Sequence, residues 1–218
     1  MSALFADRRD AGQQLAARLL AYAWRPDVVV VALPRGGVEV AYEVARALRA
    51  PLDVIVVRKL GVPGHPELAM GAIVSGGERV VNESVVRMLG IPPEVIDQAS
   101  AREEAVLRHR EALYRSGRPA LSLEGKTVIV VDDGLATGST MRAALQAIRR
   151  RHPARVVMAV PVAAPSTLEE LAPLADDVEC LATPEPFVAV GLWYGDFSPV
   201  SDDIVTDLLS HTPSPVQV

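Results

Sequence analysis

The chain has 218 residues, of which 50% are hydrophobic, a length and composition that suit one domain with an ample core. Its formal net charge of −5 argues against a nucleic-acid-binding surface as the main activity, because neutralising phosphates requires clustered Lys and Arg. The single Cys180 excludes a disulfide framework, four scattered histidines offer no metal-ligand spacing, and no apolar run approaches the roughly 20 residues of a membrane span. We therefore expect a protein of the reducing cytoplasm without a membrane or nucleic-acid partner.

The first predicted element is an amphipathic helix that runs through Leu15 and Leu19 to Tyr22. Asp7 or Asp10 is a natural N-cap for it. The mixed charges of residues 5–10, Phe-Ala-Asp-Arg-Arg-Asp, are best explained by capping and surface pairing rather than by ligand binding.

Residues 28–33 form an unbroken apolar run, which predicts a buried strand, and a helix through Val44 and Leu48 follows. Between them lies Pro34-Arg35-Gly36-Gly37. A glycine-rich turn between a strand and a helix N-terminus places backbone amides where an anion binds. A plain turn would fit these four residues equally well, so the motif gains weight only from a second one.

A third apolar run, residues 52–57, ends in the cations Arg58 and Lys59. Two cations at the carboxyl end of a strand need a nearby anion to offset their desolvation, and both could reach a diphosphate. The next segment, residues 61–67, is Gly-Val-Pro-Gly-His-Pro-Glu. It is too rich in glycine and proline for regular structure, and we expect a lid there. His65 and Glu67 could do proton chemistry, although polar loop residues usually face solvent.

Two elements without ligand signals come next. Residues 70–74 and 78–81, divided by two glycines, predict a β-hairpin. A short helix within residues 82–90 and a long one over residues 94–116 follow. The mixed charges of the long helix indicate a solvated face with i,i+4 pairs, and an arginine-rich nucleic-acid helix is the less favoured alternative.

Residues 126–141 carry the strongest signal. A buried strand over residues 127–131 leads into two carboxylates, Asp132 and Asp133, and then into a turn that opens a helix running to Arg151. Amides, hydroxyls and the positive end of the helix dipole suit a phosphate, whereas the two acids would repel one and need hydroxyl donors or a hydrated cation. A ligand with a phosphate about a ribose length from a vicinal diol satisfies both halves.

The remainder of the chain completes the sheet. Residues 155–162 and 178–182 predict strands, with helices over residues 166–174 and 202–209. Alternating strands and helices predict an α/β fold with a doubly wound, mostly parallel sheet, whose right-handed crossovers leave both anion loops at one edge. Aromatic residues gather in residues 187–197, where core packing is the favoured role of Trp193 and Tyr194 over stacking on a base. Residues 211–218 are expected to form a loose tail.

The run Val-Val-Asp-Asp-Gly-Leu-Ala-Thr-Gly-Ser-Thr at residues 130–140 resembles the signature of the type I phosphoribosyltransferases. Residues 34–37 are similar to the diphosphate loop of that family, in which a non-proline cis peptide is common. The resemblance covers about residues 28–200, although its motifs are short. It implies one domain over residues 1–210, with a lid hairpin at about 60–81 and hood elements near 183–200.

The resemblance also implies ligands and roles. Phosphoribosyl diphosphate with Mg²⁺ would donate its phosphoribosyl group to a small nitrogen acceptor and release diphosphate. A homo-oligomer is compatible with this. The rival hypothesis is a regulatory protein that binds phosphoribosyl diphosphate without transferring it.

The implied site residues fall into three groups. Phosphoribosyl diphosphate would contact Arg35, Gly36, Gly37, Asp132, Asp133, Gly134, Leu135, Ala136, Thr137, Gly138, Ser139 and Thr140. The catalytic residues would be Arg58, Lys59 and Asp133. The metal would be held by Asp132 and Asp133, largely through ribose hydroxyls or water, with Asp196 as a further ligand.

Two departures bear on the acceptor. Ala136 stands where the 6-oxopurine enzymes place a third acid proposed to handle the proton of the base. Residues 160–164, Val-Pro-Val-Ala-Ala, offer no counterpart of the basic side chain that reads the exocyclic oxygen. Hypoxanthine and guanine are therefore poor candidates. The Asp-Asp and Ala-Thr-Gly pattern looks more like the adenine enzymes, but the rest of their base site is not recognisable.

Overall fold

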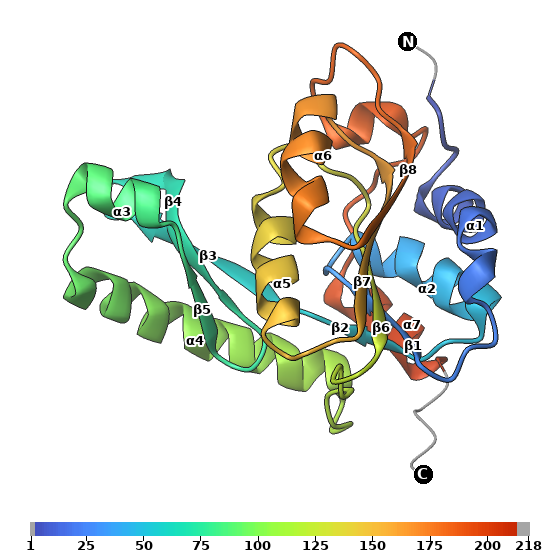
Figure 1. Ribbon diagram of the computed structural model, residues 1–218, viewed down its shortest axis with the longest axis horizontal. Coiled ribbons are helices and arrows are strands. Elements are labelled where there is room, and N and C mark those ends of the chain that lie inside the picture. Colours follow the sequence, from blue (N-terminus) through green and yellow to red (C-terminus); the bar gives the residue numbers. More distant parts are fainter. Residues whose placement is uncertain (1–2, 213–218) are drawn as a thin grey trace.

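A five-stranded parallel sheet forms the centre of the computed structural model, which describes residues 3–212 (Figure 1). Its strands are β1 (Val28–Ala32), β2 (Leu52–Val54), β6 (Thr127–Val131), β7 (Arg155–Val162) and β8 (Asp177–Ala182). They lie in the order β2-β1-β6-β7-β8, and every neighbouring pair is parallel. The expected doubly wound sheet is confirmed.

Strand order reverses between β1 and β6, which pair directly along their whole length. In open α/β sheets ligands bind outside the carboxyl ends of the strands at such a switch point. The turns that follow β1 and β6 therefore stand side by side at the place where a ligand site is expected.

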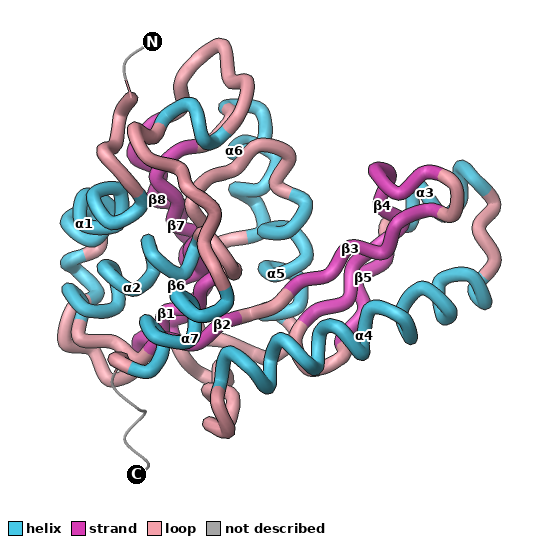
Figure 2. Tube along the Cα trace, turned by 180° about the vertical axis from the view of Figure 1, so that it is seen from behind, coloured by secondary structure: helices cyan, strands magenta, loops and turns pink. Residues whose placement is uncertain are grey.

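Helices cover both faces of this sheet (Figures 1 and 2). One face carries α1 (Arg8–Arg18), α2 (Gly37–Leu48) and α7 (Asp202–Ser210), and the other carries α5 (Ser139–Arg149) and α6 (Pro165–Leu171). Short 3₁₀ segments complete the body: η1 (Leu20–Tyr22), η2 (Ala172–Leu174) and η3 (Val190–Trp193). Within residues 3–212, no helix has the length and apolarity to cross a membrane.

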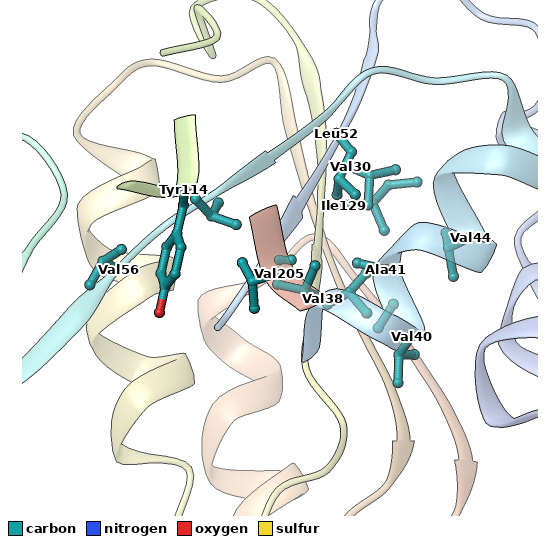
Figure 3. Close-up of a cluster of buried hydrophobic side chains, with 14 of the residues drawn as sticks. Val30, Val38, Val40, Ala41, Val44, Leu52, Val56, Tyr114, Ile129 and Val205 are labelled. Carbon is teal, nitrogen blue, oxygen red and sulfur yellow. The ribbon is translucent and has the colours of Figure 1, made fainter. Parts of the chain in front are cut away.

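The side chains of β1 and β6 alternate between the two faces of the sheet and so contribute to the core on both sides. Val30 and Ile129 point to α2 and α7 and meet Val38, Ala41 and Val205 (Figure 3). Their sequence neighbours on the same strands point to the other face and pack with α5. Because β1 and β6 are buried on both faces, each large side chain in them contributes about 1.5–3 kcal/mol. The turns at their ends are thus attached to strands that are buried along their whole length.

An arm extends from the body (Figures 1 and 2). It consists of β3 (Val57–Val62), β4 (His65–Val74), β5 (Glu78–Val81), α3 (Glu83–Leu89) and α4 (Pro93–Arg115), and its three strands form an antiparallel sheet. The hairpin, both helices and the i,i+4 pairing on the long helix were predicted, and Arg108–Glu104 is such a pair. The structure adds the Asn82 cap of α3. The helix α4 runs along the arm and returns to the body, where Tyr114 is fully buried in the core.

The arm also corrects two expectations. The third apolar run is not one strand: β2 ends at Val54, and the chain crosses to the second sheet, where β3 begins at Val57. Residues 61–67 are not irregular either, because they end β3 and begin β4 around a turn with Gly64 at φ 81°. Register shifts at Gly61 let the two strands pair despite the glycines and prolines. Of the expected loose tail, residues 213–218 lie outside the described residues, and Thr212 is buried.

Candidate active site

The turns after β1 and β6 touch each other, as expected from the topology. A Cβ atom added to Gly36 would lie 1.9 Å from Oδ2 of Asp133, and one added to Gly37 would lie 2.9 Å from Cα of Asp132. No side chain larger than hydrogen fits at either position without moving the acids. The Pro34–Arg35 peptide is cis, as the resemblance of residues 34–37 to the diphosphate loop implied.

Both turns open helices whose first amides have no side-chain partner; in α2 the Val38 amide donates to the Arg35 carbonyl at 3.1 Å. Within the described chain, α2 and α5 have no side-chain N-cap, since they follow Gly36 and Gly138. By contrast, α1, α3 and α7 are capped by Asp7, Asn82 and Ser201. The helices α4 and α6 also lack a side-chain cap, but each begins with a proline, which has no N–H group to offer. Uncapped N–H groups and the positive end of the helix dipole form an anion site. The switch point therefore holds two such sites.

Hydrogen bonds and close contacts with β7 and α6 hold the loop after β6 in place. The Leu135 amide donates to the Val162 carbonyl at 2.9 Å, and the Thr167 hydroxyl donates to the Ala136 carbonyl at 2.6 Å. Gly138 has φ 66°, and a Cβ there would approach the side chains of Leu171 and Thr167 to 2.7 Å. These contacts hold the loop rigid and leave Ala136 and Thr137 exposed at its top.

The hydroxyl groups of this loop lie together at its exposed end. The Thr137 and Ser139 hydroxyls are 3.2 Å apart, and Thr140 is half-buried in the first turn of α5. Hydroxyls beside free amides complete a cradle for a phosphate.

The two acids differ in their surroundings. Asp132 accepts a hydrogen bond from the Asp133 amide at 2.9 Å, and burial together with the charge of Asp133 raises the pKa of Asp132 well above its usual range. Burial also raises the pKa of Asp133, but there Arg8 opposes the rise, because its Nε donates to Oδ2 at 2.8 Å. Asp132 therefore carries the less compensated charge of the pair.

Arg8 is the site residue that sequence reasoning missed. Asp7 caps α1 as predicted, but Arg8 does not form a surface pair, because its side chain is only 8% exposed and contacts Asp133. A signal was present in the sequence: a cation in the first turn of a helix lies at the positive end of the dipole, where it is unfavourable unless an anion elsewhere compensates it. The sequence could not show which anion.

The three predicted cations are not gathered at one point. Arg35 lies 3.9 Å from Asp202 at the start of α7, and its side chain is 45% exposed. Arg58 and Lys59 point to opposite faces of β3, as neighbours on a strand must. Arg58 pairs with Glu103 of α4 at 2.7 Å. The expectation that both cations end a core strand and face one anion is wrong for this reason.

Lys59 instead lines a groove of about 530 Å³ between the arm and α5. Ser139, from the loop after β6, lines the same groove, as do Arg87 and Arg142. Lys59 therefore lies on the face of the arm sheet that is turned towards the phosphate cradle. His65 lies at the start of β4, on the same hairpin.

The three acids predicted to hold the metal do not all lie together. Asp196 accepts hydrogen bonds from the amide and hydroxyl of Ser198, at 2.9 and 2.5 Å. It forms no cluster with the acid pair, and residues 3–212, apart from the side chains at 66 and 67, contain no group of three or more His, Cys, Asp or Glu that could hold a metal. Mg²⁺ does not need such a group, because it is commonly held by one or two carboxylates, substrate phosphates and water. Asp132 and Asp133 fit that pattern, and Asp196 is not placed with them.

The segment near residues 187–197 packs over the acid loop. A Cβ on Gly134 would lie 2.6 Å from Cγ1 of Val190, and the Tyr194 hydroxyl donates to the Asp133 carbonyl at 2.5 Å. Trp193 and Tyr194 are each 5% exposed, and the Tyr194 ring lies 5.3 Å from that of Phe5. The preferred prediction of core packing for both residues is confirmed.

Comparisons with known proteins agree with this geometry. The family model described as "Phosphoribosyl transferase domain" matches residues 6–192. "Putative phosphoribosyl transferase Rv0571c" of Mycobacterium tuberculosis is 48% identical over 206 residues, which cover 94% of this chain and 46% of that protein. The chain thus spans about half the length of such curated relatives. "Bifunctional protein PyrR" of Chloroflexus aurantiacus is 33% identical over 129 residues, or 58% of this chain and 65% of that protein.

Among solved structures, TT1426 from Thermus thermophilus is 44% identical and superposes with a TM-score of 0.85, covering 96% of this chain and 99% of the other. The AQ2163 protein from Aquifex aeolicus, 14% identical with a TM-score of 0.53 over 93% and 84% of the two chains, shares the fold alone. The enzyme class implied by the family is that of the glycosyltransferases, as predicted. The chain belongs to the phosphoribosyltransferase domain family.

Proposed function

We propose that the site binds phosphoribosyl diphosphate with Mg²⁺ and transfers the phosphoribosyl group to a nitrogen acceptor, releasing diphosphate. The observation that carries this proposal is the packing of the uncapped N-terminus of α2 against the two carboxylates of the loop that opens the uncapped α5. Each N-terminus suits an anion, and the acids between them suit hydroxyls or a hydrated cation. One ligand with a phosphate at each end and a diol in the middle satisfies all three.

Each of the two anion sites would bind a different phosphate group of the ligand. The start of α5, with the Thr137 and Ser139 hydroxyls, would take the 5′-phosphate, and the start of α2, with Arg35, would take the diphosphate. Asp132, whose charge is less compensated than that of Asp133, would receive the ribose hydroxyls. Mg²⁺ held at Asp132 and Asp133 would supply charge neutralisation for the leaving diphosphate.

The transfer itself needs little from the protein beyond binding and electrostatics. The acceptor nitrogen forms a bond to the anomeric carbon while the bond from that carbon to the diphosphate oxygen breaks, and the nitrogen then loses its proton. The sugar passes through an oxocarbenium-like state, as in glycoside hydrolysis. The α2 amides and Arg35 would stabilise the charge that develops on the departing diphosphate. Exclusion of water would prevent hydrolysis of the sugar.

The arm would provide that exclusion. Its hairpin of β3 and β4 faces the groove that contains Lys59 and Ser139, so closure would bring Lys59 over the phosphate cradle. We expect backbone amides of residues 60–80 to exchange hydrogen more slowly when phosphoribosyl diphosphate and Mg²⁺ are added. Unchanged exchange in this segment would contradict a lid.

The acceptor is limited by Ala136. Its exposed methyl group stands beside the cradle and cannot take a proton, so an acceptor that depends on a base at this position loses help worth about 10²- to 10⁴-fold. Hypoxanthine and guanine should therefore react slowly, and Ala136→Asp should increase their turnover. Efficient formation of inosinate or guanylate by the unmodified protein would overturn this argument.

The proposal is tested by titration calorimetry followed by a turnover assay. The protein should bind phosphoribosyl diphosphate in the presence of Mg²⁺ and release diphosphate with at least one member of a panel of bases and amines. Binding without diphosphate release across the whole panel would favour the regulatory alternative. The absence of binding would contradict both hypotheses.

A further inference from the structure

Arg8 reaches the site from outside both ligand-binding turns. It is the first residue of α1, and its Nε donates to Oδ2 of Asp133 at 2.8 Å. The same guanidinium donates from NH1 to the Ser198 carbonyl at 2.9 Å and lies 3.8 Å from the centre of the Phe197 ring. Glu39 of α2 is 3.7 Å away. Four separate segments of the chain therefore meet at one buried cation.

The position of this cation is closely constrained. A Cβ on Gly36 would lie 2.9 Å from Nε of Arg8 as well as against Asp133, so the ion pair rests directly on the turn after β1. The segment before α1 is itself bound to the segment after η3: the Gly195 amide donates to the Phe5 carbonyl and the Asp196 amide to the Ala6 carbonyl, each at 2.8 Å. Arg8 thus has little freedom to swing away from Asp133.

We propose that Arg8 is a positioning residue: it fixes the Asp133 carboxylate and compensates its charge, and so leaves Asp132 as the acid that receives the ribose hydroxyls. This inference rests on the proposed function, since it assigns a role to the same acids. It assigns different roles to two adjacent carboxylates, Asp132 and Asp133, that the sequence alone could not distinguish.

The physical argument concerns a polyanionic ligand. Two uncompensated carboxylates at the switch point would repel the phosphates on either side, whereas one compensated and one free carboxylate keep a single acceptor group at a lower electrostatic cost. A planar guanidinium with two hydrogen bonds and an aromatic face holds its partner in one orientation, which an ammonium group cannot do. The orientation of Asp133 would otherwise depend only on its backbone.

The test is a double-mutant cycle on the dissociation constant of phosphoribosyl diphosphate with Mg²⁺, using Arg8→Met, Asp133→Asn and the double variant. Arg8→Met should weaken binding about 10- to 100-fold, the range for a lost hydrogen bond to a charged group. In the Asp133→Asn background the same change should have less than about a third of that effect on a logarithmic scale. Equal effects in both backgrounds would show that Arg8 does not act through Asp133 and would overturn the proposal.

Two further variants separate positioning from folding. Arg9→Met is the matched control, because Arg9 is the next residue of α1, has a side chain 70% exposed and pairs with Glu43 rather than with the site. It should bind within about twofold of the unmodified protein. Arg8→Lys keeps the charge but not the planar fork, so it should recover part of the affinity, and it replaces Arg8→Met if that variant does not fold.

The outcomes distinguish this inference from the proposed function. Failure of the unmodified protein to bind contradicts the function and the role of Arg8 together. Binding by the unmodified protein with equal or tighter binding by Arg8→Met overturns the role of Arg8 alone, because Arg8 would then be neutral or a competitor for Asp133. Weaker binding with coupling to Asp133 and partial recovery in Arg8→Lys supports it.

Discussion

The turn after β1 and the turn after β6 share one local design, a buried strand, glycines and an uncapped helix, but their charged side chains lie in different surroundings. Arg35 of the first turn is 45% exposed and lies 3.9 Å from Asp202, whereas Asp133 of the second is 16% exposed and bonded to Arg8 at 2.8 Å. Solvent screens the first charge, and an arginine distant in the sequence compensates the second. The difference indicates that the second turn depends on the rest of the fold far more than the first.

The largest loss of ligand affinity should come from a side chain added where the two turns are in contact. In Gly36→Ala the new methyl group would occupy the position now held by Asp133 Oδ2, and the backbone of both turns would have to move. Overpacking of this kind costs about 1–3 kcal/mol of stability, and because ligand binding would require both turns in their present positions, we expect the binding free energy to lose a similar amount, which is about 5- to 150-fold in affinity. Calorimetry with phosphoribosyl diphosphate and Mg²⁺ measures it.

The control for this change is Gly117→Ala. Gly117 has φ 83° and open space around it, so its substitution should reduce stability through backbone strain without changing ligand affinity. Equal losses of affinity in the two variants would mean that the contact between the turns is irrelevant to binding.

Neutralising the two acids should affect ligand binding alike but the free energy of unfolding differently. Both substitutions should weaken ligand binding by about 1–3 kcal/mol, Asp132→Asn because it removes the charged acceptor proposed for the ribose hydroxyls, and Asp133→Asn because it removes the charged hydrogen bond with Arg8 that orders the site. Asp133→Asn should also lower the free energy of unfolding, since it leaves Arg8 buried beside an uncharged partner. Asp132→Asn should leave that free energy unchanged or raise it, because burial and Asp133 already disfavour the Asp132 charge.

Chemical denaturation of both variants at neutral pH, without ligand, checks this contrast. A larger loss of stability in Asp132→Asn than in Asp133→Asn would contradict the assignment of Arg8 to Asp133.

The smallest effect belongs to the exposed cation of the first turn. Arg35→Met should leave the free energy of unfolding unchanged within about 0.5 kcal/mol, since a half-exposed pair at 3.9 Å stabilises little. It should still reduce diphosphate affinity, by about 1 kcal/mol, because solvent screens part of the interaction. Thermal unfolding alongside diphosphate titration separates the two quantities, and a large drop in stability would mean that Arg35 is a structural residue.

The sequence predicts the features that depend on neighbouring residues and misses those that depend on contacts between residues far apart in the chain. The parallel sheet and the two anion turns were predicted because valine runs, glycines and helix starts within residues 28–37 and 127–140 are local signals. The strands around residues 61–67 were missed because antiparallel pairing and a register shift overrode local glycine and proline preferences. Arg8 was missed because its partner is 125 positions away, and Arg58 was misplaced because the end of β2 was not visible in an unbroken apolar run.

The most direct test is a crystal structure of the protein with phosphoribosyl diphosphate and Mg²⁺. We predict the 5′-phosphate on the amides at the start of α5, the diphosphate on the amides at the start of α2, and the ribose diol against Asp132 with the Arg8–Asp133 pair intact. A ligand bound elsewhere, or bound with the ribose away from the acid pair, would contradict the account.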